Sequence, residues 1–166
     1  MTTFATMKTR LQSRGFDYLT STVQAEFIND AYLEVCEMED WPFLEATSSG
    51  TAPLTISDLR TIETVIDTTS TVRLSPLDRR HILEGDYQLS TTGTPSWYYL
   101  TTGSAVNVYP ANTTDTISVA YWKVPTELSA DGDVLVVPSR FCDIVLYGAR
   151  AAAYWDSDNT EMAEAM

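Results

Sequence analysis

The side chains that could carry catalysis are few, and the chain has a single histidine, His81, on which a Ser-His-Asp or Cys-His arrangement would depend. It stands next to Arg79 and Arg80 in a predicted short helix. A triad also needs partner residues at defined positions, and the sequence indicates none. We therefore expect no catalytic residue and no enzymatic activity.

Metal-binding and phosphate-binding patterns are incomplete. The run Asp156-Ser157-Asp158-Asn159 begins like a calcium loop, but its sixth position is Glu161 instead of glycine and the bidentate glutamate is missing. The triplet Asp131-Gly132-Asp133 is typical of a turn. Gly93 and Gly103 are isolated among Thr, Ser and Pro, which also indicates turns. No cluster of cysteine and histidine could hold zinc. We expect neither a metal nor a cofactor.

The two cysteines, Cys36 and Cys142, stand among apolar residues in predicted helices. Free cysteines in such positions usually behave as small buried hydrophobic residues. A disulfide is the weaker alternative for an intracellular chain.

Composition predicts a folded chain of about one domain with a large acidic excess. The chain has 166 residues and a formal net charge of −13. This charge argues against a sequence-independent grip on nucleic acid, which requires Lys and Arg, and it fits a surface that DNA passes without sticking. The apolar runs are too short to span a membrane, and residues 1–15 lack an apolar signal core. We expect the protein to stay in the cytoplasm where it is made.

The charge is distributed unevenly along the chain. Residues 1–19 carry three basic residues and one acidic residue, whereas residues 126–166 carry eight acidic and two basic residues. Ends of opposite sign suit contact between neighbouring copies in an assembly. Scattered solvated charge is the simpler alternative.

Helical patterns lie at both ends of the chain. Residues 4–14 repeat apolar positions at helical spacing and stop at Gly15. A second helix runs from residue 21 or 22 to residue 39 and ends before Pro42, and we expect Trp41 and Phe43 after it to fill the core. The last helix begins at Pro138 and is apolar most of the way round, so it should be buried on several sides. A neighbouring subunit or the core of a monomer could supply that burial.

The middle of the chain reads as strands. Threonine, serine and β-branched residues alternate with turn formers there. The predicted strands are 44–48, 53–57, 61–67, 72–74, 97–101, 105–109 and 116–124. In the last of these, Ile117, Val119 and Tyr121 alternate with Ser118, Ala120 and Trp122, so one face should be buried. A short helix is expected to begin with Ser75 as N-cap and Pro76 at its first position, and to end at Gly85; residues 134–137 are also strand-like.

These elements predict an α+β fold. The N- and C-terminal helices are expected to form a small helical bundle, with an antiparallel β-sandwich or barrel-like region inserted between them. We expect a single domain over residues 1–166, composed of the N-terminal helices (1–42), the β insertion (43–126) and the C-terminal helix and tail (134–166).

Aromatic residues are concentrated in the later strands. The set comprises Trp97, Tyr98, Tyr99, Tyr109, Tyr121 and Trp122. They could line a sugar-binding face, but aromatic residues on alternating strands more often serve as core on one side and as interface on the other.

A series of short motifs follows in a fixed order. It comprises a helix that ends at Trp41-Pro42-Phe43, the segment Gly93-x-Pro95-x-x-Tyr98, the strand end Tyr109-Pro110, a strand that ends at Tyr121 and is followed by Pro125 and Leu128, and a helix start at Pro138-x-x-Phe141. No single motif is diagnostic. Their order and spacing over about residues 20–155 resemble the head–tail adaptor (connector) proteins of tailed bacteriophages.

The resemblance implies a structural role in the virion neck, between capsid and tail. Members of that family usually form a ring of twelve copies beneath the portal protein. The ring extends the DNA channel and offers a docking platform to the tail, stopper or nozzle proteins. The implied partners are the portal, those tail components, other copies of the chain, and double-stranded DNA that passes during ejection without specific recognition. No membrane partner is implied.

The C-terminal region contains the expected contact residues. We expect the portal or subunit interface to comprise Arg140, Asp143, Tyr147, Arg150, Tyr154 and Trp155. Acidic residues expected to face the channel, where they would repel DNA phosphates, are Asp156, Asp158, Glu161 and Glu164. The expected structural anchors are Trp41, Pro42, Phe43, Gly93, Pro95, Tyr109, Pro110, Tyr121 and Pro138. Relatives often continue with a longer tail after the last helix, so a short tail and missing residues are both open.

Two alternatives remain at the level of the sequence. One is a stopper or tail-completion protein, which would be built more from β-structure than the helical ends of this chain suggest. The other is a carbohydrate-binding β-module that binds through the aromatic residues. This hypothesis predicts a monomer or trimer that binds glycans.

Overall fold

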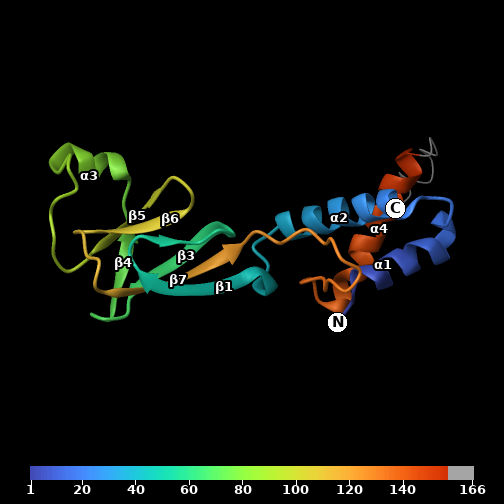
Figure 1. Cartoon of the computed structure of the whole chain (residues 1–166), viewed down its shortest axis with the longest axis horizontal. Helices are drawn as coiled ribbons and strands as arrows, with labels where there is room; N and C mark the ends of the chain where they lie inside the picture. Colours follow the sequence, from blue (N-terminus) through green and yellow to red (C-terminus); the bar gives the residue numbers. More distant parts are fainter. Residues whose placement is uncertain (157–166) are drawn as a thin grey trace. The chain divides into compact units, whose positions relative to one another are not determined.

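The computed structural model describes residues 1–156 and confirms the α+β class (Figure 1). It contains two compact units. The helical unit combines Met1–Leu44 with the chain from Pro125 onward, and the β unit is Glu45–Val124. The insertion of strands between terminal helices thus follows the sequence prediction. That the whole chain acts as one domain stays a prediction, as do the bundle and the sandwich.

Helix α1 (Phe4–Leu11) begins at the N-cap Thr3, whose side chain accepts a hydrogen bond from the Thr6 N–H. Its helical repeat buries Phe4, Met7 and Leu11. A π-helical turn (Gln12–Phe16) follows, and the predicted stop at Gly15 is confirmed because this glycine takes a left-handed φ of 98°.

Helix α2 (Ser21–Glu37) begins at Thr20, which accepts from the Val23 N–H. Its buried residues are Gln24, Ile28, Ala31, Tyr32, Val35 and Cys36. Burial of the one polar side chain among them is compensated, because the Gln24 amide donates to the carbonyls of Phe16 (3.2 Å) and Leu19 (2.9 Å) and accepts from Gln12. These bonds fix the turn between α1 and α2.

The end of α2 corrects one expectation. Trp41 and Phe43 are only partly buried and stack on each other at 5.6 Å, while Leu44, at the end of the 3-10 turn Pro42–Leu44, is fully buried. The Trp41 indole N–H donates to the Val35 carbonyl at 2.7 Å. Trp41 therefore satisfies a C-terminal carbonyl of the helix, and the adjacent core position belongs to Leu44.

A 3-10 turn (Ser139–Phe141) opens the last helix, α4 (Cys142–Asp156), with Pro138 as its N-cap. The buried side of α4 consists of Cys142, Val145, Leu146, Ala149 and Ala153. The helix packs on α2, and a Cβ added to Gly148 would lie 2.9 Å from the Ala31 Cβ. Glycine is therefore needed for the backbones to approach this closely.

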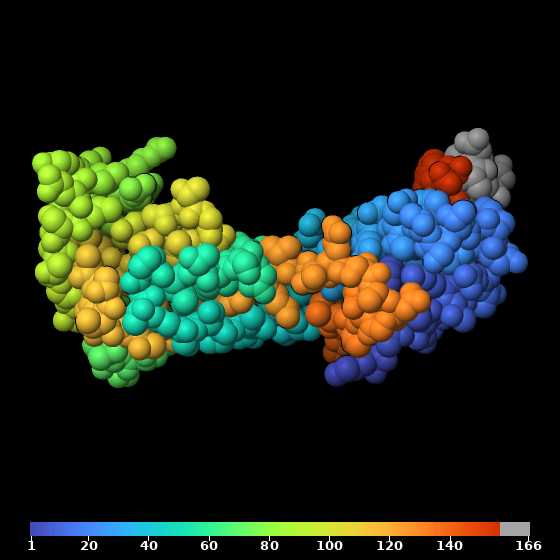
Figure 2. Space-filling view, in the orientation of Figure 1, coloured from blue at the N-terminus to red at the C-terminus, as the bar shows by residue number. Residues whose placement is uncertain are grey.

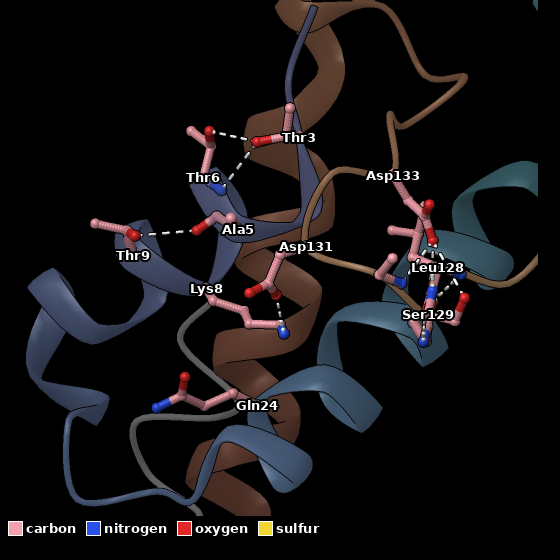
Figure 3. A network of polar contacts seen from close by, with 12 residues as sticks. Thr3, Ala5, Thr6, Lys8, Thr9, Gln24, Leu128, Ser129, Asp131 and Asp133 are labelled. Atoms are coloured by element: carbon pink, nitrogen blue, oxygen red, sulfur yellow. Dashed lines mark hydrogen bonds and ion pairs between the residues drawn. The ribbon is translucent and has the colours of Figure 1, made fainter.

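The segment that leads into α4 (orange in Figure 2) lies against α1 and α2. Polar contacts tie it to both helices (Figure 3). The Asn29 side chain donates to the Leu128 carbonyl and accepts from its N–H, both at 2.9 Å. The Lys8 ammonium lies 2.7 Å from the Asp131 carboxylate. The strand predicted at residues 134–137 does not form; this stretch makes one bridge, between Val134 and Thr3.

Asp133 orders the turn at the centre of that segment. Its carboxylate accepts from the backbone N–H groups of Ser129 (2.7 Å) and Ala130 (2.8 Å). The Ala130 and Ser129 N–H groups lower the pKa of Asp133, because both bonds favour the ionised form. The prediction of a turn at residues 131–133 is confirmed.

The β unit contains seven strands in one sheet, and each corresponds to a predicted strand. They are β1 (Glu45–Thr51), β2 (Leu54–Thr55), β3 (Leu59–Asp67), β4 (Val72–Pro76), β5 (Trp97–Thr101), β6 (Ala105–Tyr109) and β7 (Thr116–Lys123), in the spatial order β1-β7-β3-β4-β5-β6-β2. The two outer strands approach one another, since a Cβ on Gly50 of β1 would lie 2.9 Å from Leu54 Cδ1 of β2. The sheet is therefore nearly closed, like a barrel.

The inner face of this sheet holds the core of the β unit. Ile117, Val119 and Tyr121 are 1%, 0% and 6% exposed, which confirms the alternation predicted for β7. They pack with Val65, Leu74, Val106 and Val108 from the other strands. One expectation fails: β4 and β5 pair in parallel through Ser75 with Trp97 and Pro76 with Tyr98, so the sheet is not wholly antiparallel.

The short helix begins later than predicted. Helix α3 is Arg79–Gly85, and its N-cap is Asp78, which accepts from the Arg80 N–H at 2.9 Å. Ser75 and Pro76 instead end β4, where the Ser75 N–H donates to the Ser96 carbonyl. Pairing with β5 outweighs the local capping preference.

Replacing Gly148 by valine tests the α2–α4 contact. We expect G148V to lower the free energy of unfolding by about 1–3 kcal/mol, because the new side chain would overlap Ala31. Chemical denaturation measures the effect. Gly132, also in the helical unit, has no atom within 4 Å of an added Cβ, so G132A is the control and should change stability by less than about 0.5 kcal/mol. Equal losses would contradict the packing account.

Asp133 gives a pH prediction. Its folded pKa is depressed, so its stabilising effect is present above the ordinary carboxyl pKa and is lost as the pH falls through the folded value. We expect D133N to be less stable than the parent at neutral pH, and the difference to shrink below about pH 4. Denaturation of both proteins across this range measures it, with D17N, at an exposed aspartate of the same unit, as the control. A difference independent of pH would show that the carboxylate is not the cause.

Candidate interaction site

Helix α4 presents an apolar face away from its buried side. Ile144, Tyr147 and Trp155 are 47%, 52% and 51% exposed. Together with the partly buried Ala151 they repeat at helical spacing, and we call these four residues the apolar face of α4. Large aromatic and aliphatic side chains gathered on one helix face are typical of a surface that a partner covers.

A basic side chain borders this face. The Arg150 guanidinium lies 5.7 Å from the centre of the Tyr147 ring. Its Nε is buried and has no hydrogen-bond partner among residues 1–156. A buried donor without a partner is costly, so Arg150 is a side chain whose environment a bound partner could complete.

The predicted interface residues divide into two groups. Arg140, Asp143, Tyr147 and Trp155 are exposed, whereas Arg150 and Tyr154 are partly buried. Tyr154 packs edge-on against Phe16 at 4.8 Å and thus belongs to the interior contacts of the helical unit. Asp143 lies 3.5 Å from Arg10 of α1, and the Arg140 guanidinium lies 4.8 Å from the Phe141 ring.

Ile144 is the residue that sequence reasoning missed. Its place among apolar residues suggested a core position, but the structure leaves it half exposed. The available signal was its spacing of three and eleven residues from Tyr147 and Trp155, which puts all three on one side of a helix. Of the acidic residues expected at a channel, Asp156 is exposed at the end of α4, and Asp158, Glu161 and Glu164 lie outside the described residues.

Of the predicted anchors in the β unit, Gly93, Pro95, Tyr109 and Pro110 lie around the β5–β6 hairpin, and Tyr121 lies in β7. Pro95 is buried, and the Ser96 N–H after it donates to the Tyr109 carbonyl at 3.1 Å. A Cβ on Gly93 would lie 3.7 Å from Pro110, whose peptide bond with Tyr109 is cis. Tyr121 donates from its hydroxyl to Asp58 at 2.9 Å. Burial raises its pKa, and Asp58 adds to the rise.

No catalytic arrangement emerges among residues 1–156. His81 is exposed on α3, and the described chain has no group of three or more His, Cys, Asp or Glu side chains that could hold a metal ion. Cys36 and Cys142 form no disulfide and are buried, as predicted. Burial raises the pKa of Tyr32 to about 12, helped by Cys36, so its phenol stays protonated and structural.

The aromatic residues of the β unit do not form one sugar-binding face. Tyr99 and Tyr121 are 8% and 6% exposed, and Trp97, at 39%, packs beside Tyr109 at 6.3 Å. No described helix is long and apolar enough to cross a membrane.

The described residues have the order of helices and strands that the resemblance to phage adaptors implies. A family model described as SU10 adaptor protein matches residues 2–166, and the chain belongs to this family. It is thus a bacteriophage adaptor, a structural class of protein, which confirms the resemblance drawn from the motifs. No curated protein matches the chain significantly.

Two alanine truncations at adjacent positions test which side of α4 supports the fold. We expect I144A to change the free energy of unfolding by less than about 0.5 kcal/mol, because Ile144 is half exposed. V145A should cost about 2 kcal/mol, because Val145 is fully buried and two methyl groups would be lost. Thermal or chemical denaturation compares them. A large loss for I144A would mean that the apolar face is part of the monomer core.

Proposed function

We propose that the protein is a head–tail adaptor that forms a ring, of twelve copies, beneath the portal in the virion neck. The ring extends the DNA channel and gives the tail, stopper or nozzle proteins their docking platform. The observation that carries the proposal is the apolar face of α4 in a chain of an adaptor family. Such a face needs a protein partner, since exposed apolar side chains of this size gain stability when covered.

The composition of the face suits a contact with the portal or a neighbouring subunit. Trp155, Tyr147 and the adjoining Arg150 are of the residue types that contribute most binding energy at protein interfaces. Each contact by itself is small. Repetition around a closed ring makes many weak contacts act together.

The charge of the helical unit supports passage of DNA without capture. Residues 1–44 and 125–166 carry fifteen acidic and five basic residues, whereas the β unit carries eight acidic and five basic residues. Phosphate groups bind where Lys and Arg gather, so the helical unit offers DNA little affinity. This supports the proposal that Asp156 and the acidic residues after it face the channel.

The direct test is electron microscopy of this protein mixed with the portal ring of the same phage. We expect a second ring stacked coaxially on the portal. A well-folded protein that leaves the portal bare would overturn the portal assignment and favour the stopper alternative, which binding to tail components would then test.

Substitutions on the apolar face test which residues bind. We expect Y147A and W155A each to weaken portal binding at least about tenfold, a loss of about 1.4 kcal/mol, since both remove a large exposed side chain. Tyr87, 78% exposed in the β unit, gives the matched control Y87A. Binding is measured as the affinity of each variant for portal immobilised on a surface. Equal affinities for Y147A and Y87A would contradict the assignment of the apolar face of α4 as the portal-binding surface.

A further inference from the structure

The nearly closed sheet of the β unit has a gap between β3 and β5. Strand β4 pairs with β3 only at residues 72–74, opposite residues 65–67, and with β5 only at Ser75 and Pro76. After β4, the Leu77 N–H still donates to the Tyr98 carbonyl at 2.9 Å, so the open part of the β5 edge begins at Leu100. The first half of β3, residues 59–64, pairs with β7 on its other side. It therefore faces β5 with no strand between them.

A groove of about 600 Å³ occupies this gap. Its walls are residues 59–62 of β3, residues 98–100 of β5 and residues 76–79, which connect β4 to α3. We call it the β3–β5 groove. A second hollow of about 520 Å³ adjoins it and shares Ile62, Pro76 and Tyr98 with it. The backbones of two strands thus border a common opening, and unpaired strand edges are templates for an added strand.

The base of the groove is formed by apolar side chains at the edge of the hydrophobic core of the β unit, and these side chains remain partly exposed. Tyr98 and Leu100 stand opposite Val108 and Val106, so they project from the inner face of the sheet. Val106 and Val108 are 0% and 4% exposed, but Leu100 is 50% exposed. Leu59, Ile62 and Tyr98 are also only partly buried against the core. Apolar side chains that belong to a core but remain open indicate a missing segment of chain.

The charges at the groove indicate the character of that segment. Arg60 and Arg79 line the groove, and Arg73 lines the adjoining hollow. Burial raises the pKa of Tyr98, and the charge of Arg73 opposes the rise, which places positive charge beside this ring. The acidic residues present are Asp78, whose carboxylate already caps α3, and Glu63 in the adjoining hollow.

A second copy paired through the same edge is disfavoured. Arg60 and Glu63 fall at the two register shifts of β3, and such irregularities with charged residues discourage edge-to-edge pairing of identical strands. Two copies would also bring their arginines together. A different chain with carboxylates at these positions meets neither obstacle.

We propose that the β3–β5 groove binds an extended, acidic segment of another protein as an additional strand. Backbone groups of the segment pair with β3 or β5, alternate apolar side chains cover Ile62 and Leu100, and carboxylates meet the arginines. The site lies wholly within the β unit. The proposal goes beyond the adaptor role and stands whether or not α4 binds the portal.

A ten-residue peptide of alternating valine and glutamate is a suitable probe. We expect the fluorescein-labelled peptide to bind the isolated protein saturably, as measured by fluorescence anisotropy. Bound peptide should also slow amide hydrogen exchange at residues 59–64 or at Leu100. A peptide of the same length with proline in place of valine lacks half its backbone donors and should not bind. A valine–lysine peptide should bind at least about tenfold more weakly. Absence of binding by the glutamate peptide, or equal binding of all three, would overturn the proposal.

Matched variants locate the site. R73Q and L100S should each weaken binding of the glutamate peptide at least about fivefold. R80Q makes the same charge change at an exposed residue outside the groove walls and should leave binding unchanged. An equal loss of peptide affinity in R80Q and R73Q would mean that binding depends only on the overall positive charge, and it would overturn the assignment of the groove as the binding site. A 20-base-pair DNA duplex that protects the same amides at physiological salt would identify a phosphate site instead.

Discussion

The helical unit depends on the close approach of α2 and α4 at Ala31 and Gly148. The two helices stand on opposite sides of the inserted β unit in the sequence, so no local interaction brings them together. Burial of apolar surface must do so, and small residues at the contact let the backbones approach. This packing also selects which side of α4 is covered. Val145 and Ala149 turn inward, and Ile144 and Trp155 consequently remain at the surface.

The β unit is governed by a different constraint, the divergence of β4. Its first residues complete the ladder with β3, and its last residues pair in parallel with β5. One short strand therefore joins two parts of the sheet that it cannot fully bridge. The inner face stays continuous through Val65, Leu74 and Val108, while its border at Leu100 opens to solvent. A hydrophobic core and an exposed groove are thus consequences of the same topology.

Local patterns predicted the elements, and packing between distant segments decided the rest. The strict alternation in β7 and the apolar repeats in α1 and α2 were enough to predict these elements. A period of two residues fits only a strand, and a period of 3.6 residues fits only a helix. Where α3 begins was not predictable from capping preference, because Ser75 belongs to β4 and its N–H donates to the Ser96 carbonyl. The open side of α4 was not predictable either: a helix apolar nearly all round does not reveal which face its neighbours cover. The exposed charges of Arg140 and Asp143 followed from residue type, whereas burial of Tyr154 required knowledge of Phe16.

Half-exposed apolar residues suit an adaptor that must assemble in order. Full burial of a large apolar side chain contributes about 1.5–3 kcal/mol, so covering the exposed half of Ile144, Tyr147 and Trp155 gains a few kcal/mol for each copy. Association itself costs at least about 4 kcal/mol in lost freedom of motion. For one such contact, the free energy gained by burial and the free energy lost on association are therefore nearly equal, and a single copy binds weakly. In the proposed ring, successive copies bind to a surface that is already ordered, so the same small gain becomes decisive only when the contacts repeat and the ring closes.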